Sequence, residues 1–207
     1  MKGAILSIIN SFPTKKIPSA TRINLENLLK KHFKKLEPGI VLDVGAKKSP
    51  FRKYIPYTKY MTLDISKESK PDICCDIHNI KWRPGYFDTV IATELLEHSH
   101  TPQKAIDEIY KILKPGGVCI FSTRFICPYH PDPDDYFRFS SDGLRHLFRK
   151  FSKVDIEHQG NRLLVLWAMI NYNEIGKIVL NIFNPLIARI NTKKTNFPNG
   201  FIVYAEK

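Results

Sequence analysis

From residue 39 onward, the apolar residues of the chain form short uninterrupted runs, each bounded by Gly, Pro or Asp. Five of these runs predict strands, at residues 40–44, 60–65, 72–76, 87–92 and 118–122. Apolar runs without polar alternation are typical of strands that are buried on both faces, as in parallel sheets. A helical pattern over 102–113 separates the fourth run from the fifth. The alternation of strands and helices predicts a doubly wound α/β fold.

The segments on either side of these runs complete the predicted architecture. Before them, apolar residues at helical spacing predict an amphipathic helix that starts near Thr21, ends at Pro38-Gly39 and covers the sheet. After them we expect a loop over 129–139, a helix over 141–151, a strand over 153–157, an apolar segment over 162–191 and a last strand over 201–205. Pro185 favours two helices in the apolar segment. The predicted domains are an N-terminal helical segment (1–38) and a main domain (39–207).

Charge and cysteine content add broad limits. The 32 basic and 20 acidic residues give a net charge of +12, which attracts nucleic acid, an anionic membrane surface or a phosphorylated substrate. A solvated basic surface explains the excess equally well, because the lysines lie in short scattered clusters. The four cysteines show no CxxC spacing, and no apolar stretch reaches the ~20 residues that span a bilayer. We expect a cytoplasmic protein, with peripheral contact to a membrane as a further option.

Acidic residues end three successive predicted strands. Asp43 is followed by Gly45, Asp64 lies about 20 residues later, and Asp76 ends the third run. In an open parallel sheet, ligands bind beyond the carboxyl ends of the strands, and a carboxylate at the second strand suits ribose hydroxyls. A single aspartate in such a place is usually a turn former or a helix cap. Three at neighbouring strand ends predict a nucleoside pocket.

The same residues carry a family resemblance over roughly residues 39–160. Five motifs support it, at residues 41–45, 62–64, 76–77, 87–98 and 112–118. The chain resembles the class I S-adenosylmethionine-dependent methyltransferases, in particular the methyltransferase type 11-like branch. The resemblance implies a Rossmann-like, mostly parallel seven-stranded sheet with an antiparallel last strand, and S-adenosyl-L-methionine as cofactor. The cofactor contacts that it implies are Asp43, Gly45, Ala46, Asp64, Asp76, Ile77, Thr93 and Glu94.

One departure from the family pattern lies in the first motif. The usual loop continues Gly-x-Gly, but here Gly45-Ala46 is followed by Lys47-Lys48-Ser49-Pro50. Without the second glycine, we expect the backbone to approach the methionine part of the cofactor less closely. The continuation at 49–52 resembles a Ser-Pro-Tyr-Arg-like variant of the same family. The absence of G-x-G-x-x-G also argues against an NAD-binding oxidoreductase.

The loop after the fifth strand supplies the catalytic candidates. It is dense in His, Asp, Tyr and Arg, and resembles a His-x-x-Pro-x-Asp-Tyr-x-Arg-Phe pattern of the same branch. His130 is the predicted base, because an unperturbed imidazole titrates near neutral pH. Asp135 is expected either to orient His130 or to pair with Arg138 as a structural contact. We predict no metal ligand in this loop.

These features predict methyl transfer to an oxygen or nitrogen nucleophile of a small-molecule or saccharide-like acceptor. A non-catalytic basic protein on the same scaffold, which recognises an anionic surface or nucleic acid, is the alternative. Nucleic acid is the weaker partner, since the aromatic residues near the predicted site share their loop with acidic ones. The apolar segment 162–191 is interpreted as core packing, an acceptor-site lid, a dimer contact or a membrane surface.

Overall fold

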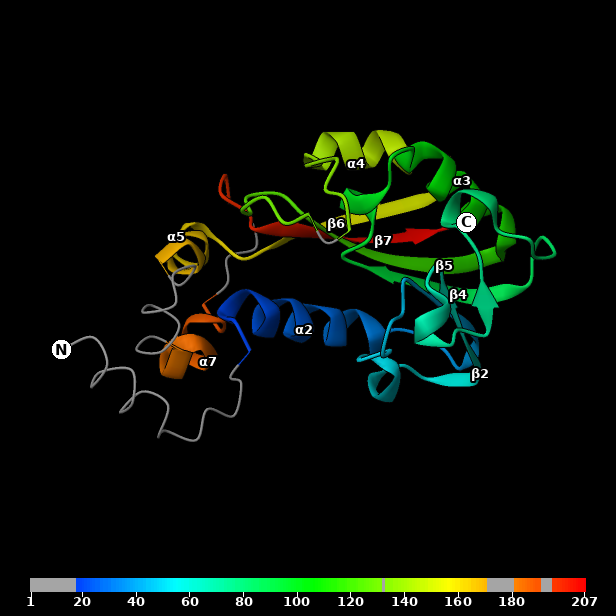
Figure 1. Cartoon of the computed structure of the whole chain (residues 1–207), viewed down its shortest axis with the longest axis horizontal. Coiled ribbons are helices and arrows are strands. Elements are labelled where there is room, and N and C mark those ends of the chain that lie inside the picture. The colour runs from blue at the N-terminus through cyan, green and yellow to red at the C-terminus, as the bar shows by residue number, and fades with distance from the viewer. Residues whose placement is uncertain (1–17, 132, 171–180, 191–194) are drawn as a thin grey trace.

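A single seven-stranded sheet organises the computed structural model, which describes all residues except 1–17, 132, 171–180 and 191–194 (Figure 1). The strand order is β3-β2-β1-β4-β5-β7-β6. The pairs from β3 to β5 are parallel, and β7 pairs antiparallel with both β5 and β6. The predicted mostly parallel, Rossmann-like α/β sheet with an antiparallel last strand is thereby confirmed.

The strands coincide with the predicted apolar runs but differ from them in their ends. They are β1 (Gly39–Val44), β2 (Tyr57–Asp64), β3 (Ile73–Cys74), β4 (Phe87–Thr93), β5 (Leu113–Arg124), β6 (Lys153–Gln159) and β7 (Gly200–Glu206). The third strand is only two residues long and stops before Asp76. The Pro115-Gly116-Gly117 sequence lies inside β5, whose register with β4 jumps from Leu113 to Val118. Gly116 has a φ of 74° there, a value that glycine adopts readily.

Helices cover both faces of the sheet. They are α2 (Ala20–Phe33), α3 (Pro102–Ile112), α4 (Ser141–Leu147), α5 (Arg162–Ile170) and α7 (Asn184–Ile187), with 3₁₀ turns η1 (Arg52–Tyr54), η2 (Lys67–Ser69), η3 (Ile77–Asn79), η4 (Leu96–His98) and η5 (Asn181–Phe183). Figure 1 shows α2 on one side of the sheet, and α3 and α4 on the other. Neighbouring strand residues alternate between these layers. Val41 packs in the cluster that holds Leu25 and Leu29 of α2, whereas Leu42 packs with Ile109 of α3.

The helix α2 starts and ends earlier than the sequence pattern suggested. Ser19, rather than Thr21, is the N-cap, and its Oγ accepts the N–H of Arg22 at 3.2 Å. The helix ends at Phe33 instead of continuing to Pro38-Gly39. The following residues form tight turns, with the N–H of Leu36 donating to the carbonyl of Phe33. These turns bury Leu36 and bring the chain to the start of β1.

The segments α5 and α7 lie against the start of α2, at the left end of the molecule as Figure 1 shows it. Ala20, Leu164 and Ala188 form a small apolar cluster there, and Asn24 donates to the carbonyl of Ala188 at 2.9 Å. Pro185 lies in the first turn of α7, where proline is well tolerated. The rest of the predicted apolar segment, 171–180 and 191, falls outside the described residues.

Two remaining expectations concern helix length and membrane spans. The helix predicted over 141–151 ends at Leu147, because the chain turns to bury both Phe148 and Phe151 before β6 begins. Within the described residues, no helix combines the length and the apolar character that a membrane crossing requires.

Candidate functional site

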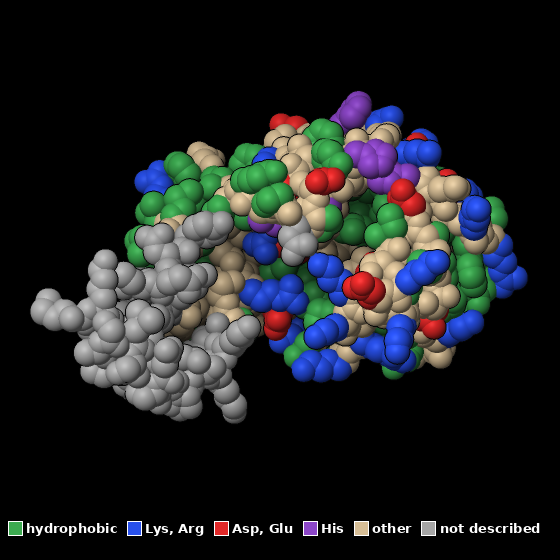
Figure 2. All heavy atoms as spheres, viewed as in Figure 1, with side chains coloured by type: hydrophobic (Ala, Val, Ile, Leu, Met, Phe, Trp, Pro, Cys, Tyr) green, Lys and Arg blue, Asp and Glu red, His purple; other side chains and the backbone are tan. Residues whose placement is uncertain are grey.

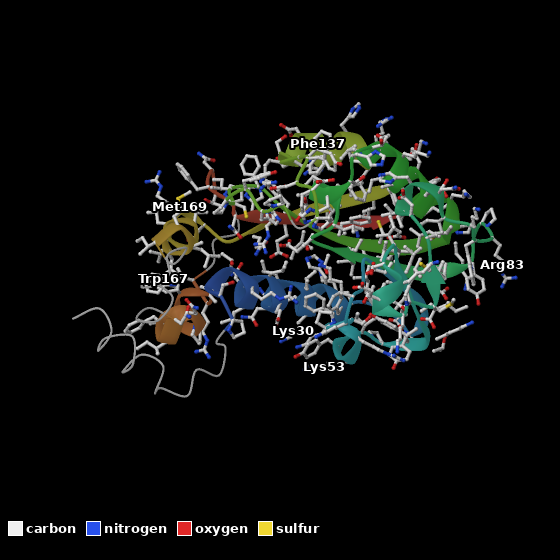
Figure 3. The ribbon with its side chains drawn as sticks, in the orientation of Figure 1. Lys30, Lys53, Arg83, Phe137, Trp167 and Met169 are labelled. Atoms are coloured by element: carbon white, nitrogen blue, oxygen red, sulfur yellow. The ribbon has the colours of Figure 1, made fainter. Side chains whose placement is uncertain are left out.

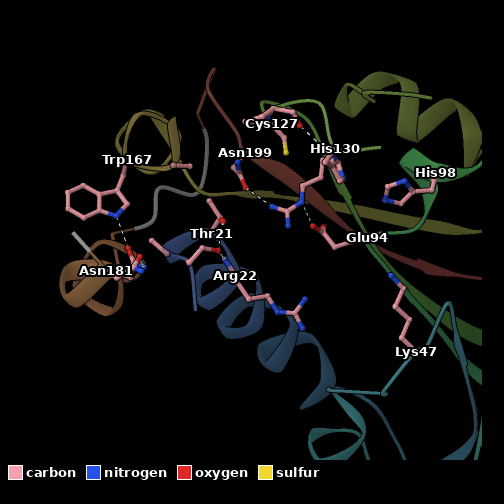
Figure 4. Close-up of a pocket in the computed structure, with 16 residues that line it drawn as sticks. Thr21, Arg22, Lys47, Glu94, His98, Cys127, His130, Trp167, Asn181 and Asn199 are labelled. Carbon is pink, nitrogen blue, oxygen red and sulfur yellow. Dashed lines mark hydrogen bonds and ion pairs between the residues drawn. The ribbon is translucent and has the colours of Figure 1, made fainter. Parts of the chain in front are cut away.

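A pocket of about 610 Å³ lies where β4 and β5 end, at the carboxyl edge of the sheet (Figure 4). The first turn of α2 forms one wall, and residues of α5, η5 and α7 form another. The charged and catalytic candidates line the remaining side, namely Lys47, Glu94, His98, Arg124 and His130. Segments that are far apart in the chain therefore meet at the edge where a doubly wound sheet binds its ligands.

The loop after β1 needs its glycine at position 45. Gly45 has a φ of 67°, and a Cβ added there would lie 2.7 Å from Cδ1 of Leu95. Its N–H donates to the carbonyl of Leu63 in β2 at 2.8 Å, and Ala46 next to it is buried. The backbone thus turns close to the ends of β2 and β4, as the motif predicts.

Lys47 occupies the position of the missing second glycine and adopts glycine-like geometry. Its φ is 42°, in the left-handed region that side chains with a Cβ rarely enter. Its backbone N–H donates to Oδ2 of Asp64 at 3.1 Å. Lys47 thus holds a backbone conformation that glycine adopts readily.

Asp64 ends β2, as predicted, and its carboxylate anchors two backbone amides. Besides the N–H of Lys47, it accepts the N–H of Ser66 on Oδ1 at 2.9 Å. A carboxylate offers about four acceptor sites, so further donors can be bound. The next residue, Ile65, exposes 71% of its surface, which places an apolar side chain in solvent beside this carboxylate.

Asp76 lies two residues beyond β3 and caps η3, so it does not end the strand as the sequence pattern suggested. Its Oδ1 accepts the N–H of His78 at 2.8 Å and lies 2.6 Å from Nδ1 of the same residue. Nε2 of His78 lies 2.7 Å from Oγ of Ser99. This chain of contacts fixes one carboxylate oxygen of Asp76. Ile77 is half-buried against the main core cluster.

Asp43 is buried near the end of β1. Its carboxylate accepts the hydroxyl hydrogen of Tyr60 at 2.7 Å, and burial raises its pKa to about 6. Of the eight predicted cofactor contacts, Glu94 lines the pocket, whereas Asp43 and the other six lie beside it.

An ion pair between Glu94 and Arg124 crosses the pocket (Figure 4). Glu94 follows the half-buried Thr93 at the end of β4 and has a φ of 53°. Its Oε1 accepts the hydroxyl hydrogen of Ser122 at 3.1 Å. Arg124 also donates to Oδ1 of Asn199 at 3.2 Å. These contacts tie the ends of β4, β5 and β7 together.

The loop after β5 is fastened by Asp135. Its carboxylate is only 1% exposed and binds both terminal nitrogens of Arg138. This guanidinium holds the pKa of Asp135 well below its usual range. The same carboxylate accepts the N–H of His130 at 3.1 Å and lies 3.2 Å from Nδ1 of that histidine. The pairing with Arg138 and the contact with His130 therefore occur together.

His130 lies against a second histidine at the pocket. The rings of His130 and His98 meet edge to face, 5.1 Å between centroids. Nδ1 of His98 lies 2.8 Å from the carbonyl oxygen of Asp134, so its ring is held from the same loop. The structure thus places two imidazoles at one side of the pocket, next to the Glu94–Arg124 pair.

Comparison with known proteins relates part of the chain to methyltransferases. A model for the methyltransferase domain matches residues 42–121. An 82-residue segment is 32% identical to the ubiquinone biosynthesis O-methyltransferase of Pectobacterium atrosepticum and covers 40% of this chain and 32% of that protein. The matched segments span between 15% and 32% of the curated relatives' lengths.

Two solved structures share the fold of this chain. A SAM-dependent methyltransferase from Archaeoglobus fulgidus superposes with a TM-score of 0.59 at 18% identity, covering 88% of this chain and 94% of that one. Phosphoethanolamine N-methyltransferase 2 from Haemonchus contortus, in complex with S-adenosyl-L-methionine, gives 0.56 at 14% identity, covering 96% and 59%. The fold that the resemblance to class I methyltransferases implied is confirmed.

Glu97 is a residue of the candidate site that sequence reasoning missed. It is fully buried, accepts the hydroxyl hydrogen of Thr123 at 2.7 Å, and its carbonyl accepts the N–H of Tyr136 at 2.9 Å. Its Oε1 has no hydrogen-bond partner among the described residues. Burial, with the nearby charge of Glu94, raises its pKa to about 7. An acid directly before His98 in the fourth motif was the available signal.

Replacing Glu97 with Gln should flatten the pH dependence of stability. Because the folded-state pKa of Glu97 is raised to about 7, its contribution to stability is complete at acid pH and is lost as the pH rises toward 7. We expect the free energy of unfolding of the wild type to fall by about 2 kcal/mol between pH 5 and pH 8. In the Glu97→Gln variant, the free energy of unfolding should decrease much less over the same pH range.

Urea unfolding at both pH values measures this effect. Glu68→Gln, which removes an exposed carboxylate, is the matched control and should keep the wild-type slope. Asp43, whose pKa is also raised, accounts for the slope that remains in Glu97→Gln. An unchanged slope in Glu97→Gln would show that this carboxyl is ionised in the folded protein throughout the range.

Proposed function

We propose that the chain is an S-adenosylmethionine-dependent methyltransferase that acts on an oxygen or nitrogen nucleophile of a small-molecule or saccharide-like acceptor. The observation that carries this proposal is the position of the loop 45–47. This loop connects Asp64, the residue expected to bind ribose, to the pocket that contains His98 and His130. The methyltransferase family match and the S-adenosylmethionine complex of the Haemonchus protein support the same cofactor.

The residues present suit this cofactor. Gly45 brings the backbone close, Asp64 has acceptor capacity left for ribose hydroxyls, and Ile65 offers an exposed apolar surface for a base. One oxygen of Asp76 is taken by His78, and the other has no hydrogen-bond partner among the described residues, so it suits an adenine amino group. Asp43, Ala46, Ile77, Thr93 and Glu94 remain contact residues of the proposal.

The proposed mechanism rests on orientation and one proton acceptor. Bound S-adenosylmethionine supplies a methyl group that its sulfonium already activates, so the protein chiefly aligns the acceptor. His130 would take the acceptor's proton at Nε2, since its Nδ1 side faces the carboxylate of Asp135 and the carbonyl of Pro128, 3.2 and 3.3 Å away. Asp135 is thus a positioning residue, held by Arg138.

The pocket wall formed by α5, η5 and α7 supports a small polar acceptor. The volume of the pocket lies in the range of small-molecule sites. This wall of the pocket contains Trp167, Asn181 and Asn184. Nε1 of Trp167 donates to Oδ1 of Asn184 at 2.8 Å, which fixes the wall. An aromatic ring beside amide groups suits a saccharide-like molecule. Within this proposal, part of segment 162–191 bounds the acceptor site.

The outer face of α5 carries exposed apolar side chains. They are Leu163, Leu166, Met169 and Ile170. Figure 3 shows Trp167 and Met169 at the end of the molecule formed by α5 and α7. Contact of this face with a membrane surface stays a prediction.

Calorimetric titration with S-adenosylmethionine separates the enzyme from a non-catalytic basic protein. Figure 2 shows Lys and Arg side chains spread over much of the face in view, as a solvated basic surface would have them. We expect saturable binding, followed by transfer of labelled methyl groups to members of a panel of saccharides, phenols and amines. Absence of binding heat from the folded protein would refute the proposal.

A His130→Asn variant should lose about 100-fold in kcat/KM for an oxygen acceptor, the usual effect of removing a general base. Asparagine keeps a polar side chain of similar size but accepts no proton near neutral pH. The affinity for S-adenosylmethionine, measured by calorimetry, should stay at the wild-type value. Full turnover in this variant would remove His130 as the base.

A further inference from the structure

Lys47 connects the two halves of the proposed site. Its backbone N–H donates to Asp64 at 3.1 Å, and its side chain lines the pocket. Figure 4 shows this side chain projecting toward the side of the pocket that holds Glu94 and His98. In the part of the chain that the structure describes, no carboxylate lies within ion-pair distance of its ammonium group.

The other cations that line the pocket are already engaged. Arg124 pairs with Glu94 and donates to Asn199. Arg22 pairs with Glu26 at 3.1 Å, and its guanidinium lies over the ring of Phe51. Among the described cations that line the pocket, Lys47 is therefore the one whose charge is left for a ligand.

The location of Lys47 indicates which part of a ligand it meets. A nucleoside whose ribose contacts Asp64 would send its 5′ substituent along the loop 45–47 into the pocket. If that substituent is an α-amino acid, it carries one carboxylate and one ammonium group. Lys47 offers the cation that complements the carboxylate at that point.

The backbone strain at this position points the same way. A glycine would adopt a φ of 42° without steric cost. Lys47 adopts the same φ at a steric cost, because its Cβ lies close to the backbone. Strained residues of this kind concentrate at ligand sites, where the side chain has a role. Lys48 next to it is exposed and does not line the pocket.

We propose that Lys47 binds the carboxylate of the amino-acid part of the cofactor and so determines specificity for it. This inference rests on the proposed function, because it takes S-adenosylmethionine as the ligand. It assigns a recognition role to the residue at which the loop departs from the Gly-x-Gly pattern.

Calorimetry with two ligands tests this role. The ligands are S-adenosylhomocysteine and its decarboxylated analogue, S-adenosyl-3-thiopropylamine, which lacks only the carboxylate. We expect Lys47→Met to weaken binding of S-adenosylhomocysteine about tenfold, in line with the loss of one charged hydrogen bond. Binding of the analogue should be unchanged or slightly tighter, because the variant no longer places a cation near its ammonium group.

Two further variants control for charge and for loop geometry. Lys48→Met removes the same charge from the adjacent position and should leave both affinities unchanged. Lys47→Gly relieves the backbone and should lose S-adenosylhomocysteine affinity as Lys47→Met does. Equal loss of both ligands in Lys47→Met, or wild-type affinity for S-adenosylhomocysteine, would overturn the role. Failure of both ligands to bind the folded wild type would instead refute the proposed function, and this inference with it.

Discussion

Replacing Asp64 with Ala should weaken binding of S-adenosylhomocysteine at least about 100-fold, because two charged hydrogen bonds to the ribose would be lost. Asp64 is buried at the end of β2, and its carboxylate is oriented by the N–H groups of Lys47 and Ser66. A carboxylate that is already oriented binds hydroxyl groups at little further entropic cost. Calorimetric titration of both proteins measures the loss.

The same substitution removes two acceptors for loop amides, so loop distortion must be separated from lost ribose contacts. The 2′-deoxy analogue of S-adenosylhomocysteine makes this separation. The wild type should bind it more weakly than the parent ligand, and Asp64→Ala should bind the two equally. If Asp64→Ala binds the parent ligand as well as the wild type does, the nucleoside pocket lies elsewhere.

The sheet and its ligand edge could be predicted from sequence because both depend on local patterns. Strands buried on both faces produce unbroken apolar runs, and the residues after β1, β2 and β4 include the motif residues Gly45, Asp64 and Glu94. Where burial is partial, the pattern was less informative. Asp76 belongs to a capped turn and not to the short β3, since an aspartate can begin either kind of element.

The pocket itself could not be predicted, because it depends on contacts between distant segments. The start of α2, the end of β5 and the region of α7 meet there through side chains such as Arg124 and Asn184. Neither residue stands in a recognisable motif. Glu97 was also missed. In the sequence it resembles any acidic residue of a surface turn, and only its burial in the folded chain distinguishes it.

Lys47 shows a backbone geometry that the missing glycine alone does not predict. The missing glycine indicates a loop that has lost conformational freedom. The structure shows a left-handed lysine whose amide still reaches Asp64. The left-handed backbone of Lys47 could not be predicted from the sequence, because contacts with neighbouring segments hold it in place.

The Asp135→Ala variant should lose about 2 kcal/mol of unfolding free energy at pH 7, because Arg138 would be left half-buried without its partner. This loss is smaller than the loss expected for a fully buried ion pair, because the Arg138 side chain is 26% exposed and solvent screens its charge. The folded-state pKa of Asp135 is lowered, so this contribution is present above pH 4 and is lost only in stronger acid. The deficit should therefore be equal at pH 5 and pH 8, unlike the effect of Glu97→Gln.

Asp134→Ala is the matched control for this substitution, because Asp134 is exposed and contacts only the hydroxyl of Tyr136 by its side chain among the described residues. Urea unfolding should show a change within about 0.5 kcal/mol for this variant. Loss of Asp135 should also release His130, so methyl transfer should fall in Asp135→Ala and not in Asp134→Ala. Wild-type stability and turnover in Asp135→Ala would mean that the loop is held by the Glu97 carbonyl contacts alone, and that His130 needs no carboxylate to orient it.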